Sequence, residues 1–433
     1  MGYLLLCFEI DGPAMRIRLI AILLLGGLLL SASLPSAHAQ STTTWTVGPD
    51  EELTRITDAL SEAEDGDRIV VRSGTYTESP IMITKQVHII GEGDPIIDAQ
   101  ADNEALVIAA DSVEVEGLTI ENIAHSHIRD RAGIRVVDSR HVRVANNTLN
   151  NTFFGIYLAE SRHITVENNT IRGEAERESR AANAIHMWNT DSTHVANNTV
   201  SGHRDGIYIE FAEGSTFENN TSTDNLRYGL HFMFSDHSSY EGNVFRRNGA
   251  GAAVMFSSHI VMRNNEFSHN WGPSIYGLLL KDMRDSVIED NRFYRNTTGI
   301  YAEGSSRLEI NGNHLERNGW GVRVLSNCYD MTFTRNNFVG NTFDVTTNSR
   351  RNPNTFTENY WSKYDGYDLE GDGYGDVPHR PVRLFALIVE RQPVAMTMLG
   401  SLFVDLLDIA ERVLPVLTPE TLVDERPLMR EVE

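Results

Sequence analysis

Apolar and polar residues alternate over short stretches of this chain, as they do in β-strands. Between residues 228 and 239 the alternation places three apolar residues on one face of a predicted strand: Leu230, Phe232 and Phe234. The opposite face carries His231 and Met233, where Lys or Thr would be ordinary. The sequence therefore predicts an exposed imidazole beside an exposed thioether.

Two short patterns repeat in step along the chain. An Asn pair recurs as "ANNT" at 145, "ENNT" at 167, "ANNT" at 196, "ENNT" at 218, "RNNE" at 263 and "RNNF" at 335. Strand-like tetrapeptides such as "GIRV" at 133, "GIYL" at 155, "GIYI" at 206, "GLHF" at 229, "GAAV" at 251 and "GVRV" at 321 are commonly 22 residues apart, with insertions between some of them. This period is too short for two packed helices, and the regular Leu scaffold of a leucine-rich repeat is absent.

The repeat predicts an all-β fold, a right-handed parallel β-helix with coils of about 22 residues, because stacked coils bury apolar residues that one repeat could not bury alone. We expect the β-helix to occupy residues 40–363, with Trp45 to Leu60 capping its open end. Each "NNT" is formally a glycosylation sequon, but the recurrence of the Asn pairs at one turn position favours a structural ladder of asparagines.

The first 39 residues have the pattern of a signal peptide, which predicts that the protein is exported. Arg16 and Arg18 precede the apolar run Leu19 to Leu30, and "AHA" (37–39) supplies small residues at a cleavage site, so residues 1–39 are interpreted as a signal peptide. The true start could be Met15, and an uncleaved anchor is the alternative, although the run is shorter than the about 20 residues that span a bilayer. The formal charge of −23 argues against nucleic acid and anionic membranes as partners.

The outward residues of successive coils suggest a soft-metal site. Because Gly229 and Gly251 begin neighbouring coils, Met255 should lie over Met233, and with His231 they form a candidate Cu(I) site. Weaker candidate ligands lie on the same or neighbouring coils: His186, His237, His259 and Met262. The alternative is that the methionines only pack against a partner, since Met is common at adaptable contact surfaces.

Polysaccharide chemistry is the obvious alternative for an exported β-helix. "NTD" (189–191) matches one motif of inverting polygalacturonases, but the chain has no Asp-Asp, Gly-His-Gly or Arg-Ile-Lys. Their mechanism needs paired carboxylates, so Asp191 is interpreted as a turn residue. We therefore predict that the protein is not an enzyme.

Residues 364–433 differ from the repeats. The segment "YDGYDLEGDGYGDVPHRP" (364–381) spaces Asp368, Glu370, Asp372 and Asp376 as in the opening of an EF-hand-like loop, with His379 where a closing Glu would stand, so Ca²⁺ binding is an open alternative to a metal-free turn. An amphipathic helix follows, and its apolar face is expected to cap the last coil or to dock on another protein. That predicted partner-binding face comprises Leu402, Phe403, Leu406, Leu407, Val413 and Leu414. The tail 417–430 is longer than a simple cap needs and favours docking.

The combination of exported β-helix repeats, "NYWSKYDGYDLEGDGYGDVPHRPVRLF" (359–385) and "VDLLDIAERVLPVLTPETLVDERPLMR" (404–430) closely resembles the NosD family of the nitrous oxide reductase system. The resemblance implies a periplasmic component of an ABC transporter that contacts the membrane only through a permease dimer and, through it, a cytoplasmic ATPase. It also implies a role in building the copper centres of nitrous oxide reductase, together with a copper chaperone lipoprotein. The alternatives are a secreted polysaccharide-binding or polysaccharide-cleaving protein and a structural adaptor without metal.

Overall fold

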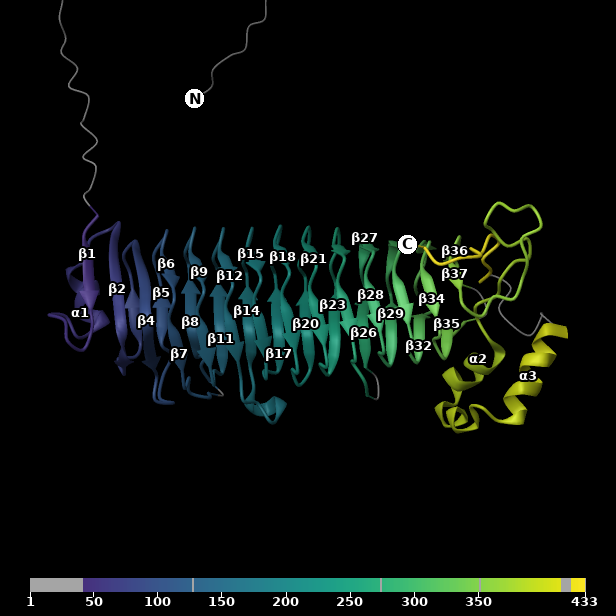
Figure 1. Ribbon diagram of the computed structural model, residues 1–433, viewed down its shortest axis with the longest axis horizontal. Coiled ribbons are helices and arrows are strands. Elements are labelled where there is room, and N and C mark those ends of the chain that lie inside the picture. The colour runs from purple at the N-terminus through teal and green to yellow at the C-terminus, as the bar shows by residue number, and fades with distance from the viewer. Residues whose placement is uncertain (1–41, 127, 273–274, 350–351, 414–421, 433) are drawn as a thin grey trace, which may run out of the picture. The chain divides into compact units, whose positions relative to one another are not determined.

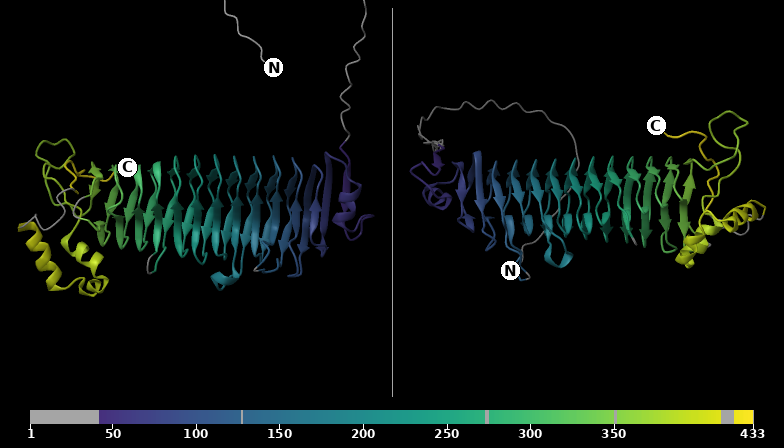
Figure 2. Two further views of the ribbon diagram at one scale, coloured as in Figure 1. Left: turned by 180° about the vertical axis from the view of Figure 1, so that it is seen from behind. Right: turned by 60° about the horizontal axis from the view of Figure 1, so that its bottom comes forward.

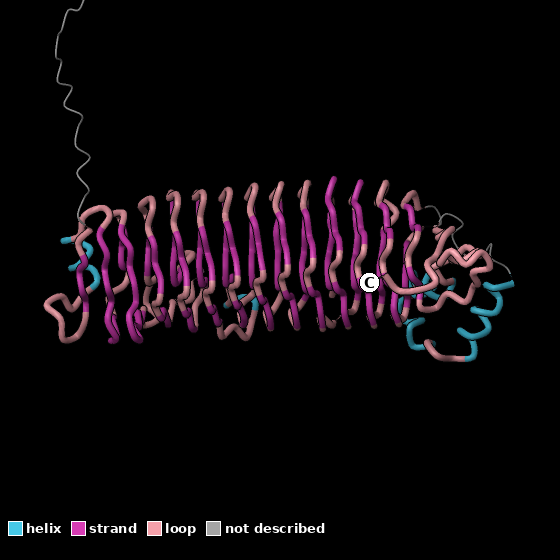
Figure 3. Tube along the Cα trace, turned by 45° about the horizontal axis from the view of Figure 1, so that its top comes forward, coloured by secondary structure: helices cyan, strands magenta, loops and turns pink. Residues whose placement is uncertain are grey.

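The computed structural model describes residues 42–126, 128–272, 275–349, 352–413 and 422–432. The predicted leader therefore lies outside the described residues. The described chain forms a right-handed parallel β-helix of about 14 turns with coils of about 23 residues, which confirms the predicted fold (Figure 1). Strands of successive coils line up along the solenoid in every view (Figures 2 and 3).

One face of the solenoid is a twelve-stranded parallel sheet, called here the outer sheet. Its strands are β3 (Ile81–Ile83), β5 (Leu106–Ile108), β8 (Ala132–Val137), β11 (Phe154–Ala159), β14 (Asn183–Trp188), β17 (Asp205–Glu210), β20 (Tyr228–Met233), β23 (Ala250–Met255), β26 (Tyr276–Lys281), β29 (Thr298–Glu303), β32 (Trp320–Val324) and β35 (Phe343–Thr347).

The remaining strands form a 25-stranded sheet made of two parallel ladders that share the long strands of the first coils. The first ladder contains β1 (Thr44–Val47), β2 (Asp67–Tyr76), β4 (Val87–Asp98), β6 (Glu114–Glu116), β9 (Arg143–Ala145), β12 (Thr165–Glu167), β15 (His194–Ala196), β18 (Thr216–Glu218), β21 (Ser239–Glu241), β24 (Val261–Arg263), β27 (Arg284–Glu289), β30 (Ser306–Asn311), β33 (Thr332–Thr334) and β36 (Thr355–Thr357). The second continues from β4 through β7 (Thr119–Glu121), β10 (Thr148–Asn150), β13 (Thr170–Arg172), β16 (Thr199–Ser201), β19 (Thr221–Thr223), β22 (Val244–Arg246), β25 (Glu266–Ser268), β28 (Arg292–Tyr294), β31 (His314–Glu316), β34 (Asn337–Val339) and β37 (Tyr360–Trp361).

The core runs the length of the solenoid and is filled by the inward residues of every coil. In the middle coils these include rings stacked one above another, such as Phe245, Phe267 and Phe293, with centroids 5.3 and 4.9 Å apart. At the open end the helix α1 (Ile56–Glu62) buries Ile56, Ala59 and Leu60 against this core. The N-terminal coil is thus closed by apolar side chains.

The Asn pairs form a ladder inside the solenoid. The first Asn of a pair, such as Asn146, has a positive φ of 56°, while the second, such as Asn147, is 1% exposed. From Asn169 onward, the buried Asn amide oxygen accepts the backbone N–H and the side-chain N–H of the Asn one coil earlier, as Asn169 does from Asn147 at 3.0 and 3.1 Å. The pattern continues to Asn359. The first Asn of a pair therefore adopts the left-handed turn conformation, and the second makes the hydrogen bonds of the ladder.

The C-terminal segment closes the other end. The helix α2 (Leu384–Arg391) packs on β35, and the short helix η2 (Pro393–Met398) leads to α3 (Leu402–Val413). A further short helix, η1 (Glu178–Arg180), lies in the insertion before β14. Within the described part of the chain, none of the helices has the length and apolar character needed to cross a membrane.

Candidate functional site

The two predicted methionine ligands lie side by side on the exterior of the outer sheet. Met233 of β20 and Met255 of β23 are partners in the parallel register, and both side chains are half-buried. Parallel strands are about 4.8 Å apart, so the thioethers come from directly neighbouring coils. The same outward row holds Trp188, Glu210 and Lys281, in register with the two methionines.

His231 is not exposed, contrary to the prediction from strand alternation. Its side chain points outward from β20, but the residue is only 6% exposed because the rings of Tyr208 and Tyr228 lie against it, with centroids 5.0 and 4.8 Å away. Its Nε2 is buried and has no hydrogen-bond partner. His231 is therefore a covered imidazole with one free nitrogen.

The other nitrogen of His231 faces a buried ion pair. Arg227 donates from Nε to Asp205 Oδ1 at 2.9 Å, and its terminal nitrogen lies 3.4 Å from His231 Nδ1. The Asp205 side chain is fully buried, and its Oδ2 is 3.7 Å from His231 Nδ1. Burial alone would raise the pKa of Asp205, but the contacts from Arg227 and His231 lower it overall. This carboxylate can therefore stay charged beneath the outward row.

His186, a weaker predicted ligand, belongs to a ring stack. It lies between Tyr157 and Tyr208, with centroids 4.5 and 4.8 Å away, and its Nδ1 is 2.8 Å from the Asn183 side-chain amide. Burial lowers the pKa of His186 to about 3. The stack is extended by Tyr208, which meets His231 edge-on. His186 is thus two coils away from His231 and packed between aromatic faces.

The remaining weaker candidates occupy two different environments. His237 and His259 are exposed turn residues that stack on each other 4.6 Å apart, and Glu213 lies 3.2 Å from His237 Nδ1. His141 and His163 form the same kind of stack in earlier coils. Met262 is fully buried in the core, because the alternation of β24 turns it inward. Met262 therefore cannot join a site on the exterior.

Phe234 also lies on the opposite side from the one that alternation predicts. Strand β20 ends at Met233, and Phe234 follows in the left-handed region with φ 51° and is 46% exposed. Phe211 and Phe256 occupy the same position in the neighbouring coils, and their rings stack on that of Phe234 at 5.3 and 5.1 Å. Sequence reasoning missed this row, although the recurrence of Phe directly after three successive strands was a signal for it.

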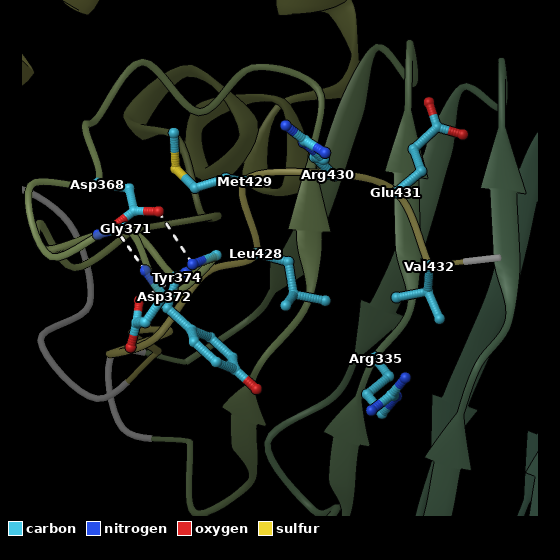
Figure 4. A pocket seen from close by; sticks show the side chains of 11 residues that line it. Arg335, Asp368, Gly371, Asp372, Tyr374, Leu428, Met429, Arg430, Glu431 and Val432 are labelled. Carbon is cyan, nitrogen blue, oxygen red and sulfur yellow. Dashed lines mark hydrogen bonds between the residues drawn. The ribbon is translucent and has the colours of Figure 1, made fainter.

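In the acidic loop, which is the alternative Ca²⁺ site predicted from the sequence, two carboxylates accept hydrogen bonds from backbone N–H groups of the loop itself. Asp368 accepts the N–H groups of Gly371 and Gly373 at 2.6 and 2.9 Å (Figure 4), and Asp376 accepts that of Leu369 at 2.6 Å. His379 does not close the loop, because its ring packs against Trp361 and Tyr364 at the end of the core. Burial lowers the pKa of His379 to about 4. Ca²⁺ binding stays a prediction.

The predicted docking helix is apolar on two sides. Val404 and Leu407 of α3 face the cluster formed with Phe343, Phe385 and Val389. Leu402, Phe403 and Leu406 are exposed, as is Ile409. The side chain of Val413 and the whole of Leu414 lie outside the described residues.

The described part of the tail caps the last coils, which the sequence reasoning did not favour. Asp424 is fully buried and accepts the backbone N–H of Asn359 at 3.0 Å and the indole N–H of Trp361 at 3.0 Å. It therefore takes the place of the next asparagine in the ladder. Beyond it, Leu428 to Val432 run beside the acidic loop and the last coils (Figure 4).

Among the described residues, no group of three or more His, Cys, Asp and Glu side chains is arranged to hold a metal ion. Residues 173–366 match the family model described as "Periplasmic copper-binding protein (NosD)". The "Probable ABC transporter binding protein NosD" of Stutzerimonas stutzeri is 28% identical, with 93% of each chain covered. The protein of the same name from Pseudomonas aeruginosa is also 28% identical, over 86% of this chain and 91% of that one.

The chain is similar to the NosD family. The family description agrees with the periplasmic location predicted from the leader. Both relatives are named as probable ABC transporter binding proteins.

Other similarities show the fold. Residues 50–252 also match a family model described as "Rhamnogalacturonase A/epimerase, pectate lyase-like". The A-module of the mannuronan C-5 epimerase AlgE6 of Azotobacter vinelandii is 13% identical, with a TM-score of 0.60 over 69% of this chain and 91% of that chain. The catalytic unit of a GH87 α-1,3-glucanase of Streptomyces thermodiastaticus gives 0.59 at 15% identity, over 71% and 65%. At these identities the likeness concerns the β-helix alone.

Proposed function

We propose that this chain assists copper-site assembly of nitrous oxide reductase as the periplasmic component of an ABC-transporter complex, and that it receives or hands over Cu(I) without catalysing a reaction. The observation that carries the proposal is the register of Met233 and Met255, which brings two thioethers from neighbouring coils to one exterior spot. Thioethers suit Cu(I) better than hard cations. The family description as copper-binding supports the same metal.

His231 is the third proposed ligand, through its unpartnered Nε2. With copper on Nε2, the neutral ring carries its proton on Nδ1, which can then donate to Asp205 after closing the present 3.7 Å separation. Without copper, Nδ1 is the nitrogen that faces the Arg227 donor. Asp205 would thus set the tautomer that binds metal.

Docking on the permease is the proposed role of α3. Leu402 is 73% exposed and Leu406 56% exposed, one turn apart on the same side of the helix. The opposite side packs on the solenoid through α2, and Arg323 fastens α2 by donating to both oxygens of Glu390 at 2.8 and 2.9 Å. The exposed row is therefore held in place by a structured base, which suits a helix that binds a partner.

The test replaces Met233 and Met255 together by Leu. Leu keeps most of the apolar volume and removes both soft ligands, so the variant should stay folded, weaken Cu(I) binding under anaerobic conditions and leave the reductase poor in copper. Met262→Leu is the matched control, because this thioether is buried in the core. Unchanged Cu(I) affinity together with a fully loaded reductase would contradict the ligand assignment and favour a structural adaptor.

A polysaccharide-cleaving function is the second candidate, favoured by the pectate lyase-like family model. Asp191 lies in a turn, 3.3 Å from Arg162, and Glu213, its bridge partner in the next coil, contacts His237 at 3.2 Å. Each carboxylate thus faces a basic side chain, which does not suit a paired acid and base. We expect no new ends after incubation with pectin or alginate. Cleavage that disappears in Asp191→Asn would revive the enzyme.

A further inference from the structure

The exposed row Phe211, Phe234 and Phe256, called here the Phe stack, occupies a turn position where the fold itself favours other residues. In successive coils from Asp138 to Phe256, the residue that directly follows the outer strand has a positive φ, between 46° and 54°. Other coils place Asp138, Glu160, Asn189 and Asp282 there, all with positive φ.

Asn and Asp tolerate this conformation because their short side chains bond to the local backbone, whereas a bulky ring in it is strained. Three consecutive coils therefore carry a residue that is unfavourable both for the turn and for solvent exposure. Each ring is between 41% and 48% exposed. Strain and exposure kept together at one place indicate a function rather than a requirement of the fold.

The Phe stack adjoins the methionine pair. Phe234 follows Met233 directly in the chain, and Phe256 follows Met255. Strands β17, β20 and β23, which carry the row, lie side by side in the middle of the solenoid (Figure 1). The rings thus span three coils and the thioethers two of them, while Glu210 takes the methionine position beside Phe211.

We propose that the Phe stack is the docking site of a folded protein that exchanges Cu(I) at Met233 and Met255, and that this protein presents an apolar surface rimmed by Lys and Arg. This inference rests on the proposed function for the identity of the exchanged metal. The charge around the rings and thioethers sets the rim. Glu210 precedes Phe211 and pairs in register with Met233, Glu213 lies two residues after Phe211, and Asp282 takes the position that follows Phe256 in the row. These three carboxylates outnumber Lys281, the cation in register with Met255. An acidic border around an apolar centre complements a cationic border on the partner.

A carbohydrate ligand fits the Phe stack poorly. The rings lie nearly parallel, at 11°, and 5.1 to 5.3 Å apart, so Phe234 has both faces covered by its neighbours. A sugar ring needs an open aromatic face, whereas the stack offers mainly ring edges, with one outer face each on Phe211 and Phe256. Edges and thioethers together suit the side chains of a protein surface.

The test replaces Phe211, Phe234 and Phe256 by Asn, because the preceding coil has Asn189 at the equivalent turn position. The triple variant should fold at least as well as the unchanged chain, because Asn relieves the strained positions. Tyr367→Asn, which removes a 54% exposed aromatic in the acidic loop, is the control. Binding to copper-free nitrous oxide reductase and to the copper-free chaperone lipoprotein, each as a separate analyte, is measured by biolayer interferometry at low and physiological salt.

The unchanged chain and the control should bind at least one analyte, more weakly at higher salt, and the triple variant should bind it at least about tenfold more weakly. Equal binding by the triple variant overturns the inference, as does a failure of the unchanged chain to bind either analyte. The inference is also overturned if the triple variant keeps protein binding and instead loses binding to alginate or self-association. Because both proteins are copper-free, a failed Cu(I) assignment at the methionines leaves this result standing.

Discussion

Replacing Asp424 by Ala should open the C-terminal end of the β-helix. The carboxylate is fully buried and accepts N–H groups of Glu358, Asn359, Trp361 and Arg426 at 3.0 to 3.1 Å. The amides of the earlier coils each find an asparagine oxygen in the next coil, but after Asn359 there is no further coil to supply one. Asp424 is therefore the acceptor on which the last rung depends.

The magnitude follows from the donors left without an acceptor. Asn359 and Trp361 are almost fully buried, and each unsatisfied N–H costs about 1–3 kcal/mol, so the last coil should lose about 4 kcal/mol. In a solenoid each coil contacts only its neighbours, so the loss should stay near the end. Opening of that coil then becomes up to about a thousandfold more frequent.

Amide hydrogen exchange measures this directly. Protection should fall over 343–361 in Asp424→Ala and remain unchanged in the middle coils around Asn220. Deleting residues 422–433 should have the same effect, and the exposed neighbour Glu425→Ala should have almost none. If Asp424→Ala retains full protection at Asn359, the tail is not a cap and the earlier expectation that it serves docking is restored.

Two further predictions concern buried charge. Burial lowers the pKa of His203 to about 4 from its ordinary 6.5, so between these pH values the unfolded chain binds a proton at this imidazole and the folded chain does not. The free energy of unfolding should therefore fall by about 3 kcal/mol as the pH drops from 6.5 to about 4. Urea unfolding of the unchanged chain and His203→Gln at pH 7 and pH 4.5 checks it, and an equal loss in both would contradict the assignment. Arg227→Met should cost about 3 kcal/mol, because it leaves the buried Asp205 carboxylate without its main partner. Thermal unfolding should show most of the loss recovered in Asp205→Asn combined with Arg227→Met, and no recovery would mean that the Arg227 side chain acts through packing.

The sequence by itself determined the repeat, the coil and the ladder. A period of about 22 residues is set by the backbone length of one coil, and Asn recurs because an amide both donates and accepts along the stack. Asn147 and Asn169 therefore behave as their spacing predicts. The register of Met233 with Met255 follows from the same arithmetic, since parallel coils pair equivalent positions.

Only the tertiary structure decided what lies outside each coil. Alternation gives the side of a strand but neither the residue at which the strand ends nor the neighbours that cover it. It therefore predicts Phe234 inward and His231 exposed to solvent, whereas Phe234 is exposed and His231 is covered. Strand ends depend on where the backbone turns into the left-handed region, and covering depends on rings contributed by other coils, such as Tyr208. The role of Asp424 is hidden for the same reason: its hydrogen-bond partners in the last coil are 63 to 66 residues away and become neighbours only when the tail returns to that coil.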